Sequence, residues 1–342
     1  MSTIEIERQT SCPLCGTAGD VLHKDLRDQL FGAPGAWGVS SCRSCGALWL
    51  DPRPTRASIG EAYRTYFTHA GRSGAAALYD GAIRRLARER AAMVYGFGRP
   101  TPGLALLCSL ATRLHAGLID QADLLIRHLP ASALESGARL LDVGCGHGEA
   151  LGFLVSLGWR ATGVEIDPLA VSAARARGLD VIEGEIGSAG FADESFDAVT
   201  SSHVIEHVHD PRAFLAESRR VLKNGGTLVA VTPNARSELR GRHGRHWLEL
   251  DPPRHLVLFN ADNLARLAIE VGLRDVSVKR TARLASFVHI ASAGIAAKGG
   301  YQLGGWSGWR LWLEAKILEA RMIRDLKRGH AEGEELVLIA RK

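Results

Sequence analysis

The stretch Ala138-Arg-Leu-Leu-Asp142-Val-Gly144-Cys145-Gly146-His-Gly148-Glu-Ala-Leu151 decides the fold. Its first half is an apolar run typical of a buried strand, and its second half is a Gly-x-Gly-x-Gly loop that leads into an apolar helix pattern. Glycines in such a loop let the backbone approach a ligand closely, and the helix N-terminus presents free N–H groups. The stretch therefore predicts a nucleotide-type ligand at the start of an α/β domain.

The next predicted strand, 160–166, carries an acidic residue where such a ligand would need one. Glu165 follows the glycine loop by about 20 residues, where a carboxylate can accept hydrogen bonds from both ribose hydroxyls. Strand and helix patterns continue to alternate beyond this point, which predicts a mostly parallel sheet covered by helices.

Four ordered segments resemble the class I S-adenosylmethionine-dependent methyltransferases over roughly residues 138–282. They are the glycine loop, the 182–186 segment, the run from Ser195 to Pro211 and the run from Val221 to Asn234. The resemblance implies a Rossmann-like seven-stranded sheet, S-adenosylmethionine as the cofactor and methyl transfer as the reaction. A dehydrogenase fits less well, because its Gly-x-Gly-x-x-Gly spacing differs from the loop here.

The same resemblance assigns residues to the cofactor. Asp142 would hold the loop and reach the cofactor's ammonium group through water, Glu165 would bind the ribose, and Glu185 would accept a hydrogen bond from the adenine amine. The full set that the resemblance implies is Asp142, Gly144, Cys145, Gly146, Gly148, Glu165, Ile166, Glu185, Ile186, Ser202 and His203.

Histidines follow the fourth and fifth predicted strands, where the methyl acceptor would lie. An imidazole can take a proton from a hydroxyl or amine as the methyl group arrives, which makes His203, His207 and His255 candidate catalytic bases. His209 and His246 are further candidates.

The group His203-x-x-Glu206-His207 has two other interpretations, because this spacing places the side chains on one face of a helical turn. It resembles the metal-holding Glu-x-x-Glu-His group of ubiquinone O-methyltransferases and small-RNA 2′-O-methyltransferases, but has His in the first position. The group can also simply cap a helix or pack in the core.

The long segment from Thr232 to Phe259 contains five Arg, three His and Trp247. Arginine suits phosphate and a tryptophan ring can stack on a sugar, so this loop predicts an anionic or sugar-bearing substrate. The alternative is a solvated basic loop in which Trp247 serves as an anchor.

Four cysteines form two Cys-x-x-Cys-Gly pairs, Cys12 with Cys15 and Cys42 with Cys45, separated by 26 residues. This spacing predicts a zinc ribbon, in which four thiolates close a structural Zn²⁺ site. Two redox dithiols or free thiols are the alternative. The intervening 23–30 segment is expected to form a short hairpin or helix, while Cys108 and Cys145 are interpreted as small hydrophobic residues.

Three further segments are typical of a narrower group: the ribbon with its 45–54 continuation, the 63–69 segment and the 247–256 loop. They resemble bacterial methyltransferases that carry an N-terminal zinc module and are associated with polysaccharide, nucleotide-sugar or secondary-metabolite pathways. The resemblance implies a small-molecule acceptor, with the methyl group moving to O, N or C of a phosphorylated or lipid-linked sugar or a related intermediate. The alternative, an RNA-directed methyltransferase, is less favoured because the ribbon lacks a dense Lys/Arg tract.

Length and composition predict several globular parts: the chain has 342 residues, 46% hydrophobic, with a net charge of +5. We expect a zinc module over 1–55, a mainly helical cap over 56–137 and the methyltransferase domain over 138–342. Its sixth and seventh strands are predicted at 274–280 and 335–341, separated by a helical insertion over 281–334. The seventh strand is expected to be antiparallel.

The insertion ends in a basic amphipathic helix, 309–328, that contains two tryptophans. This pattern suits packing against the 56–137 helices, contact with an anionic membrane or a dimer interface. No secretory signal and no membrane-spanning run are apparent, which predicts a cytoplasmic protein. Membrane contact by the basic helix would add a peripheral location at the inner membrane face.

Overall fold

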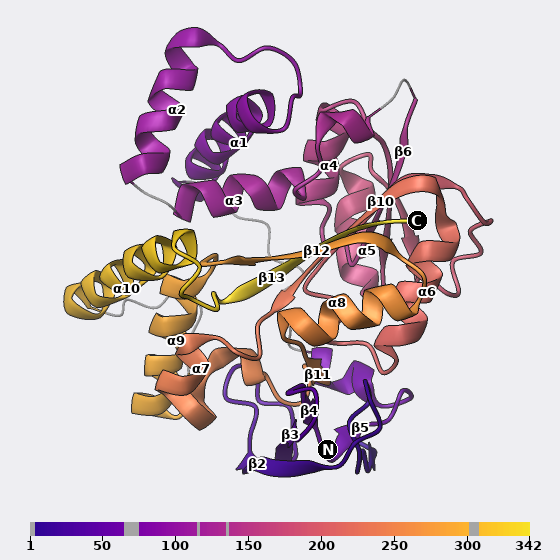
Figure 1. Cartoon of the computed structure of the whole chain (residues 1–342), viewed down its shortest axis with the longest axis vertical. Coiled ribbons are helices and arrows are strands. Elements are labelled where there is room, and N and C mark those ends of the chain that lie inside the picture. The colour runs from indigo at the N-terminus through magenta and orange to yellow at the C-terminus, as the bar shows by residue number, and fades with distance from the viewer. Residues whose placement is uncertain (1–3, 65–74, 115–116, 135–136, 301–307) are drawn as a thin grey trace.

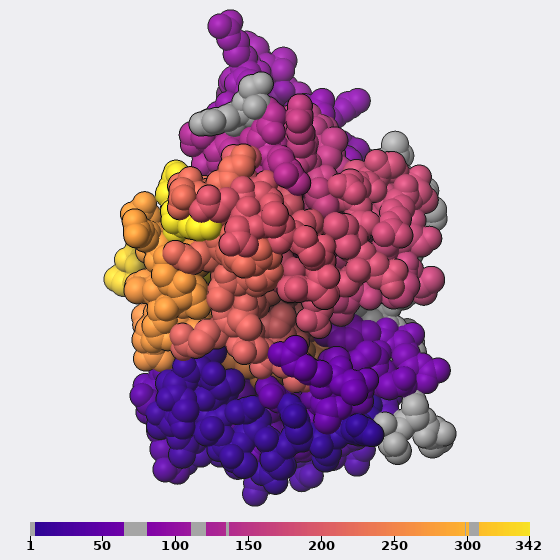
Figure 2. Space-filling model, turned by 90° about the vertical axis from the view of Figure 1, so that its right-hand side faces the viewer, coloured from indigo at the N-terminus to yellow at the C-terminus, as the bar shows by residue number. Residues whose placement is uncertain are grey.

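The computed structural model describes residues 4–64, 75–114, 117–134, 137–300 and 308–342. The 66–69 part of the predicted 63–69 segment lies outside these residues. In Figure 1 the N-terminal ribbon lies at the bottom, the central sheet above it and three helices of the cap at the top. Figure 2 shows the ribbon, in indigo, as a block directly beneath the rest of the chain.

The central sheet has seven strands in the order β12-β13-β10-β9-β6-β7-β8. Their bounds are β6 Arg139–Val143, β7 Arg160–Glu165, β8 Asp180–Glu183, β9 Phe196–Ser202, β10 Leu222–Pro233, β12 Arg274–Thr281 and β13 Glu335–Arg341. The strands β6 to β10 are parallel, whereas β13 runs antiparallel to both β10 and β12. The predicted seven-stranded Rossmann-like sheet and its antiparallel last strand are confirmed.

Two of the helices that connect these strands begin at a capping residue. Asp167 accepts a hydrogen bond from Leu169 N at the start of α5, and Asp210 accepts one from Ala213 N at the start of α6. Each cap is followed by a proline, whose fixed φ suits the first helical position. The helices of this part are α4 Glu149–Ser156, α5 Pro168–Ala176, α6 Pro211–Val221, α7 Glu238–His243 and α8 Ala261–Glu270.

The ribbon shares a sheet with the part of the chain that follows residue 138. Its strands are β1 Ile6–Glu7, β2 Gly19–Leu26, β3 Trp37–Cys42, β4 Leu48–Leu50 and β5 Arg53–Pro54, and β11 is Val257–Leu258. The sheet order is β11-β4-β3-β2, so a strand from the long basic loop completes the ribbon. The predicted 23–30 element is partly strand, because β2 forms an antiparallel pair with β3.

The cap contains α1 Ala75–Val94, α2 Pro102–Leu114 and α3 Gly117–Ile126. Helix α3 packs between α1 and α4, where Ile83, Ala87, Ile126 and Phe153 form a small apolar core. This packing ties the cap to the sheet next to the glycine loop.

The insertion between β12 and β13 forms α9 Ala285–Lys298 and α10 Trp309–Lys327. Helix α10 packs mainly against α9, not against the cap helices as one interpretation of its sequence expected. Within the described part of the chain, no helix combines the length and apolar character needed to cross a bilayer.

Candidate active site at the carboxyl edge of the sheet

The predicted cofactor residues meet where the parallel strands end. Gly146 N, in the loop after β6, donates to Glu165 Oε2 at the end of β7 over 2.9 Å. Gly184 N, just after β8, donates to the Glu165 carbonyl over 2.9 Å, and Glu185 follows it. His203 follows β9 directly. This edge is where open α/β sheets bind their ligands.

Backbone geometry explains the glycines of the loop. Gly144 has φ +69°, and a Cβ atom there would lie 2.3 Å from Val204 Cγ2. Gly148 has φ +80° and precedes the first turn of α4. Only glycine combines an unstrained positive φ with the absence of a Cβ atom, so the loop keeps its backbone open toward a ligand.

Asp142 is completely buried and held by two partners that the sequence did not reveal. Its carboxylate accepts from Thr200 Oγ1 at 2.7 Å and from Arg127 Nη2 at 3.0 Å. Arg127 follows α3, and its Nε has no hydrogen-bond partner among the described residues. The only sequence signal for a role of Arg127 was its position as a charged residue directly after the apolar run Leu124–Ile126, at the end of a predicted helix.

The carboxylate of Glu165 organises the backbone at the predicted ribose position. Besides Gly146 N it accepts from Ile166 N at 2.9 Å and from Asp167 N at 3.0 Å. The side chains of Ile166 and Glu185 are exposed, whereas Ile186 and Cys145 are buried. Burial raises the pKa of the Cys145 thiol, which fits its interpretation as a small hydrophobic residue.

His203 is clamped by charged groups. Its Nδ1 lies 3.1 Å from Glu206 Oε1 and its Nε2 lies 2.7 Å from Glu335 Oε1, while Arg283 also binds Glu335. Burial lowers the pKa of His203, but the two carboxylates outweigh it and raise the pKa to about 10. A ring that holds its proton at neutral pH cannot act as a general base, so the geometry does not support that predicted role.

His207 and His255 are oriented differently, with ring centroids 4.6 Å apart. His207 Nδ1 lies 3.1 Å from the Arg254 carbonyl and His255 Nδ1 lies 2.7 Å from the Glu249 carbonyl. Because a carbonyl only accepts, each Nδ1 carries a proton, which leaves Nε2 as the nitrogen at which His207 can accept one. Burial and the neighbouring His255 lower the pKa of His207 to about 4.

Glu206, His207 and His255 form a compact group. One ligand atom of each lies within 4.8 Å of the others. Burial raises the pKa of Glu206, but His203 outweighs it and lowers the pKa to about 2, so the carboxylate is ionised. The group departs from the predicted His203-Glu206-His207 set, because residues 203–207 form a turn and not a helix and His203 faces Glu335 instead.

Several side chains of the long basic loop form ion pairs or hydrogen bonds with other parts of the chain. Its ion pairs are Arg236 with Asp262, Arg242 with Glu314, and Arg254 with Asp28 and Asp251. Trp247 is 2% exposed, and its Nε1 donates to Glu334 Oε1 over 2.9 Å. The prediction that Trp247 stacks on a sugar is therefore wrong, and the tryptophan is an anchor.

Two cationic side chains of this loop have an unpaired buried atom. Arg240 Nε and His246 Nδ1 have no hydrogen-bond partner among the described residues. His246 lines a cavity of about 130 Å³ between ribbon residues 25–30 and loop residues 245–252. His209, another predicted base, instead contacts the Pro54 carbonyl at 2.9 Å in the ribbon.

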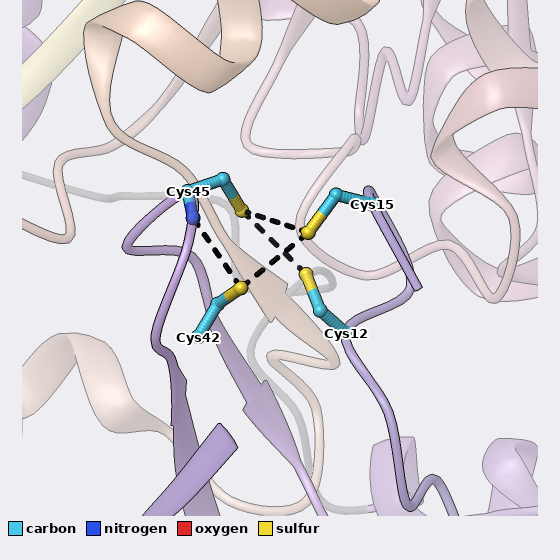
Figure 3. Close-up of side chains that lie close together, drawn as sticks. All are labelled: Cys12, Cys15, Cys42 and Cys45. Carbon is cyan, nitrogen blue, oxygen red and sulfur yellow. Dashed lines mark hydrogen bonds between the residues drawn. The ribbon is translucent and has the colours of Figure 1, made fainter. Parts of the chain in front are cut away.

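The four ribbon cysteines converge from two turns (Figure 3). Their Sγ atoms lie 3.6 Å apart for Cys12 and Cys45, 3.4 Å for Cys15 and Cys42, and 3.7 Å for Cys15 and Cys45. A tetrahedral Zn²⁺ with bonds of about 2.3 Å places its sulfurs about 3.8 Å apart, whereas a disulfide needs about 2.0 Å. The thiols therefore fit a zinc ion and not a pair of disulfides.

The cysteine turns also contact helix α8. The Cys45 carbonyl accepts from Asn260 Nδ2 at 2.8 Å, and Asn260 caps α8. The predicted zinc site therefore sits on the first turn of a helix that packs against β12 and β13.

Comparison with known proteins covers the central part of the chain. Residues 118–278 match the family model described as a methyltransferase domain, a match that begins at α3 and so includes Arg127. A probable S-adenosylmethionine-dependent methyltransferase of Mycobacterium tuberculosis (strain H37Rv) is 32% identical over 143 residues, which are 41% of this chain and 50% of the relative.

A ubiquinone biosynthesis O-methyltransferase of Xanthomonas oryzae pv. oryzae is 38% identical over 106 residues, 29% of this chain and 44% of that protein. A solved SAM-dependent methyltransferase from Archaeoglobus fulgidus is 19% identical, with a TM-score of 0.46 over 66% of this chain and 93% of that chain. The chain spans about half or less of the length of these curated relatives. Residues 118–278 are therefore similar to the methyltransferase domains of these proteins.

Proposed function

We propose that this protein transfers a methyl group from S-adenosylmethionine to a small anionic metabolite, such as a phosphorylated or nucleotide-linked sugar. One observation carries the proposal: the glycine loop with Asp142 and Glu165 meets His207 and His255 at the same edge of the sheet. The subgroup resemblance of the ribbon and the 247–256 loop supports the sugar-related acceptor.

The cofactor brings an electrophilic methyl group on a sulfonium, and the chain's residues bind and orient it. Glu165 would bind the ribose hydroxyls, and Asp142, which accepts hydrogen bonds from Thr200 and Arg127, would lie toward the methionyl end. The unpaired Nε of Arg127 leaves a donor for the carboxylate of that end. Positioning of this kind lowers the entropic part of the barrier.

His207 takes the acceptor's proton at Nε2. Its Nδ1 proton is tied to the Arg254 carbonyl, and Tyr63 Oη lies 2.9 Å from the same nitrogen, so two contacts fix the ring. A neutral imidazole with one free lone pair is the form that a general base requires.

The group Glu206, His207 and His255 supports a second role, as a divalent-cation site. Both imidazoles donate their Nδ1 proton to a backbone carbonyl, which is the usual support for a metal-bound histidine. A cation there would hold the acceptor's oxygen and favour its deprotonated form. Activity that is lost with EDTA and restored by Mg²⁺ or Mn²⁺, which do not replace zinc at four thiolates, would assign this role; activity that EDTA leaves unchanged would assign the base.

Arg240 and His246 support an anionic acceptor. Each has a buried nitrogen that finds no hydrogen-bond partner in the described part of the chain, and the cavity beside His246 lies between the ribbon and the loop. His23 on β2 lies close enough to both for their charges to lower its pKa, after the larger effect of burial. The guanidinium groups of Arg240 and Arg245, which both lie close to His23, suit a phosphate or diphosphate.

We further propose that Cys12, Cys15, Cys42 and Cys45 hold one structural Zn²⁺. Four thiolates fill its coordination shell, so the ion would stabilise the ribbon and take no part in the methyl transfer. Reduced thiols fit a reducing compartment such as the cytoplasm.

Calorimetry with S-adenosylhomocysteine tests the cofactor assignment, and folded full-length protein that fails to bind it would overturn the proposal. Methyl-labelled S-adenosylmethionine, offered with sugar phosphates, nucleotide sugars and transfer RNA, then tests the acceptor. Label on a sugar supports the proposed class, and label on RNA would assign the alternative. Arg240→Gln should raise KM for an anionic acceptor with little change in cofactor affinity, while Arg236→Gln, which alters a surface ion pair, serves as the control.

A further inference from the structure

Helix α10 presents an exposed apolar stripe. Trp309, Leu313 and Ile317 recur every four residues and share one face of the helix, with Trp312 beside them. Trp309 is 63% exposed and Ile317 is 62% exposed. The opposite face, Ala315, Glu319 and Met322, is buried. The stripe is therefore not the side by which α10 packs on the protein.

Cationic side chains continue the same stripe toward the helix C-terminus. Arg324 and Lys327 follow Ile317 at helical spacing and are exposed, with Arg321 beside them. The segment 309–328 holds six basic and three acidic residues. Its surface thus combines aromatic and aliphatic side chains with an excess of positive charge.

The three acidic residues are turned away from this stripe or already paired. Glu319 is buried and accepts from Lys316 and Ser286. Glu314 forms an ion pair with Arg242, and Asp325 lies beside Arg321 and Arg324. No acidic side chain among the described residues of α10 interrupts the apolar and basic stripe.

A second exposed apolar face lies on the same side of the molecule. Leu106, Leu107 and Leu110 of α2 are exposed and share one side of that helix. In Figure 1 both α2 and α10 lie at the left-hand edge of the molecule.

We propose that α10 binds the surface of an anionic lipid bilayer through Trp309, Trp312, Leu313 and Ile317, with Arg321, Arg324 and Lys327 on the headgroups. Tryptophan rings lie well at the boundary between headgroups and acyl chains, and each Lys or Arg near an anionic surface adds electrostatic attraction. A second copy in parallel would bring the same positive charges together, and an antiparallel copy would set the basic end of one stripe against the apolar end of the other, so both arrangements disfavour a dimer through this stripe. The proposal does not depend on the methyl acceptor.

Flotation of the full-length protein with phosphatidylcholine vesicles, with and without phosphatidylglycerol, tests the proposal. The protein should float with the anionic vesicles and much less with the neutral ones, and added salt should release it because salt screens surface charge. The variants Trp309→Ser with Trp312→Ser, and Arg324→Glu with Lys327→Glu, should each lower partitioning at least about tenfold.

A matched pair of single variants separates the stripe from general surface hydrophobicity. Ile317→Ser should reduce vesicle binding several-fold, whereas Ile269→Ser on α8, where isoleucine is 60% exposed, should leave it unchanged. Binding of S-adenosylhomocysteine and circular dichroism show that each variant is folded. Protein that floats but does not bind the cofactor analogue would support the membrane surface while overturning the proposed function.

Three results would overturn the proposal. One is wild-type protein that stays unbound with anionic vesicles at low salt, and another is equal binding by the Ile317→Ser and Ile269→Ser proteins. The third is a wild-type dimer, detected by light scattering, that does not bind vesicles and that becomes a monomer in the Ile317→Ser variant. The stripe would then be covered by a second copy of the chain.

Discussion

Arg254 and Asp28 form a completely buried ion pair between segments 226 positions apart, with N–O distances of 2.8 and 3.0 Å. Asp28 belongs to the ribbon and Arg254 to the long basic loop. The backbone carbonyl of Arg254 also accepts from His207 Nδ1. One residue thus connects the N-terminal ribbon to the proposed catalytic histidine.

Loss of one partner of this pair should destabilise the protein strongly. Arg254→Met leaves the Asp28 carboxylate buried without its partner, and we expect the free energy of unfolding to fall by about 3–5 kcal/mol in urea denaturation. Arg212→Met, which removes an exposed ion pair with Glu270, should cost less than about 1 kcal/mol. Equal losses in the two variants would contradict a structural role for the buried pair.

The zinc assignment predicts that the amount of zinc bound per chain depends on the four ribbon cysteines. Cys42→Ser should lose bound zinc, measured by atomic emission, and should lower Tm because zinc affinity is part of the folding free energy. Cys108→Ser is the control, since Cys108 is buried in the cap far along the chain from the ribbon. Wild-type protein that is fully folded without any metal would contradict the assignment.

Arg127 should matter for cofactor binding although it lies outside the glycine loop. Arg127→Met leaves Asp142 without its charged partner and removes the free Nε donor, so Kd for S-adenosylhomocysteine should rise about tenfold or more. Calorimetry measures this change. Arg84→Met, at the surface of α1, is expected to bind as wild type does.

The raised pKa of His203 predicts how stability depends on pH. Because the pKa rises from 6.5 to about 10 on folding, the stabilisation by the bound proton is complete below about pH 6.5 and is lost as the pH rises toward 10. His203→Gln lacks this proton, so the difference in unfolding free energy between the two proteins should shrink steadily over that range. A constant difference between pH 6.5 and 10 would mean that His203 is neutral in the folded protein.

His207→Ala tests the base directly. We expect kcat to fall by about 10²–10⁴ with Kd for the cofactor unchanged, because only proton transfer is lost. Tyr63→Phe should have a smaller effect, since the Arg254 carbonyl still orients the ring. If His203→Gln lowers kcat as much as His207→Ala does, the assignment of the base is wrong.

Local sequence patterns predicted much of the fold. The seventh strand was expected at 335–341 and β13 spans Glu335–Arg341, because an isolated apolar run in polar surroundings has clear ends. The mainly helical part expected over 56–137 contains α1, Ala75–Val94. The pairing of the thiols followed from the Cys-x-x-Cys spacing, because two cysteines at this spacing lie on a single turn.

Side-chain partners far apart in sequence depended on the tertiary structure alone. The composition of the basic loop suggested a free cationic surface, but Asp28, Glu314 and Asp262 neutralise three of its arginines and Glu334 holds Trp247. In the same way, Glu335 comes from the last strand to bind His203.

By itself, therefore, the sequence determined the order of strands and helices, the glycine loop and the cysteine pairs, because these depend on backbone conformation and short-range periodicity. Only the tertiary structure decided which histidine keeps a free lone pair and which face of α10 meets solvent. Both depend on burial and on charges that folding brings from distant segments, and local sequence does not encode either.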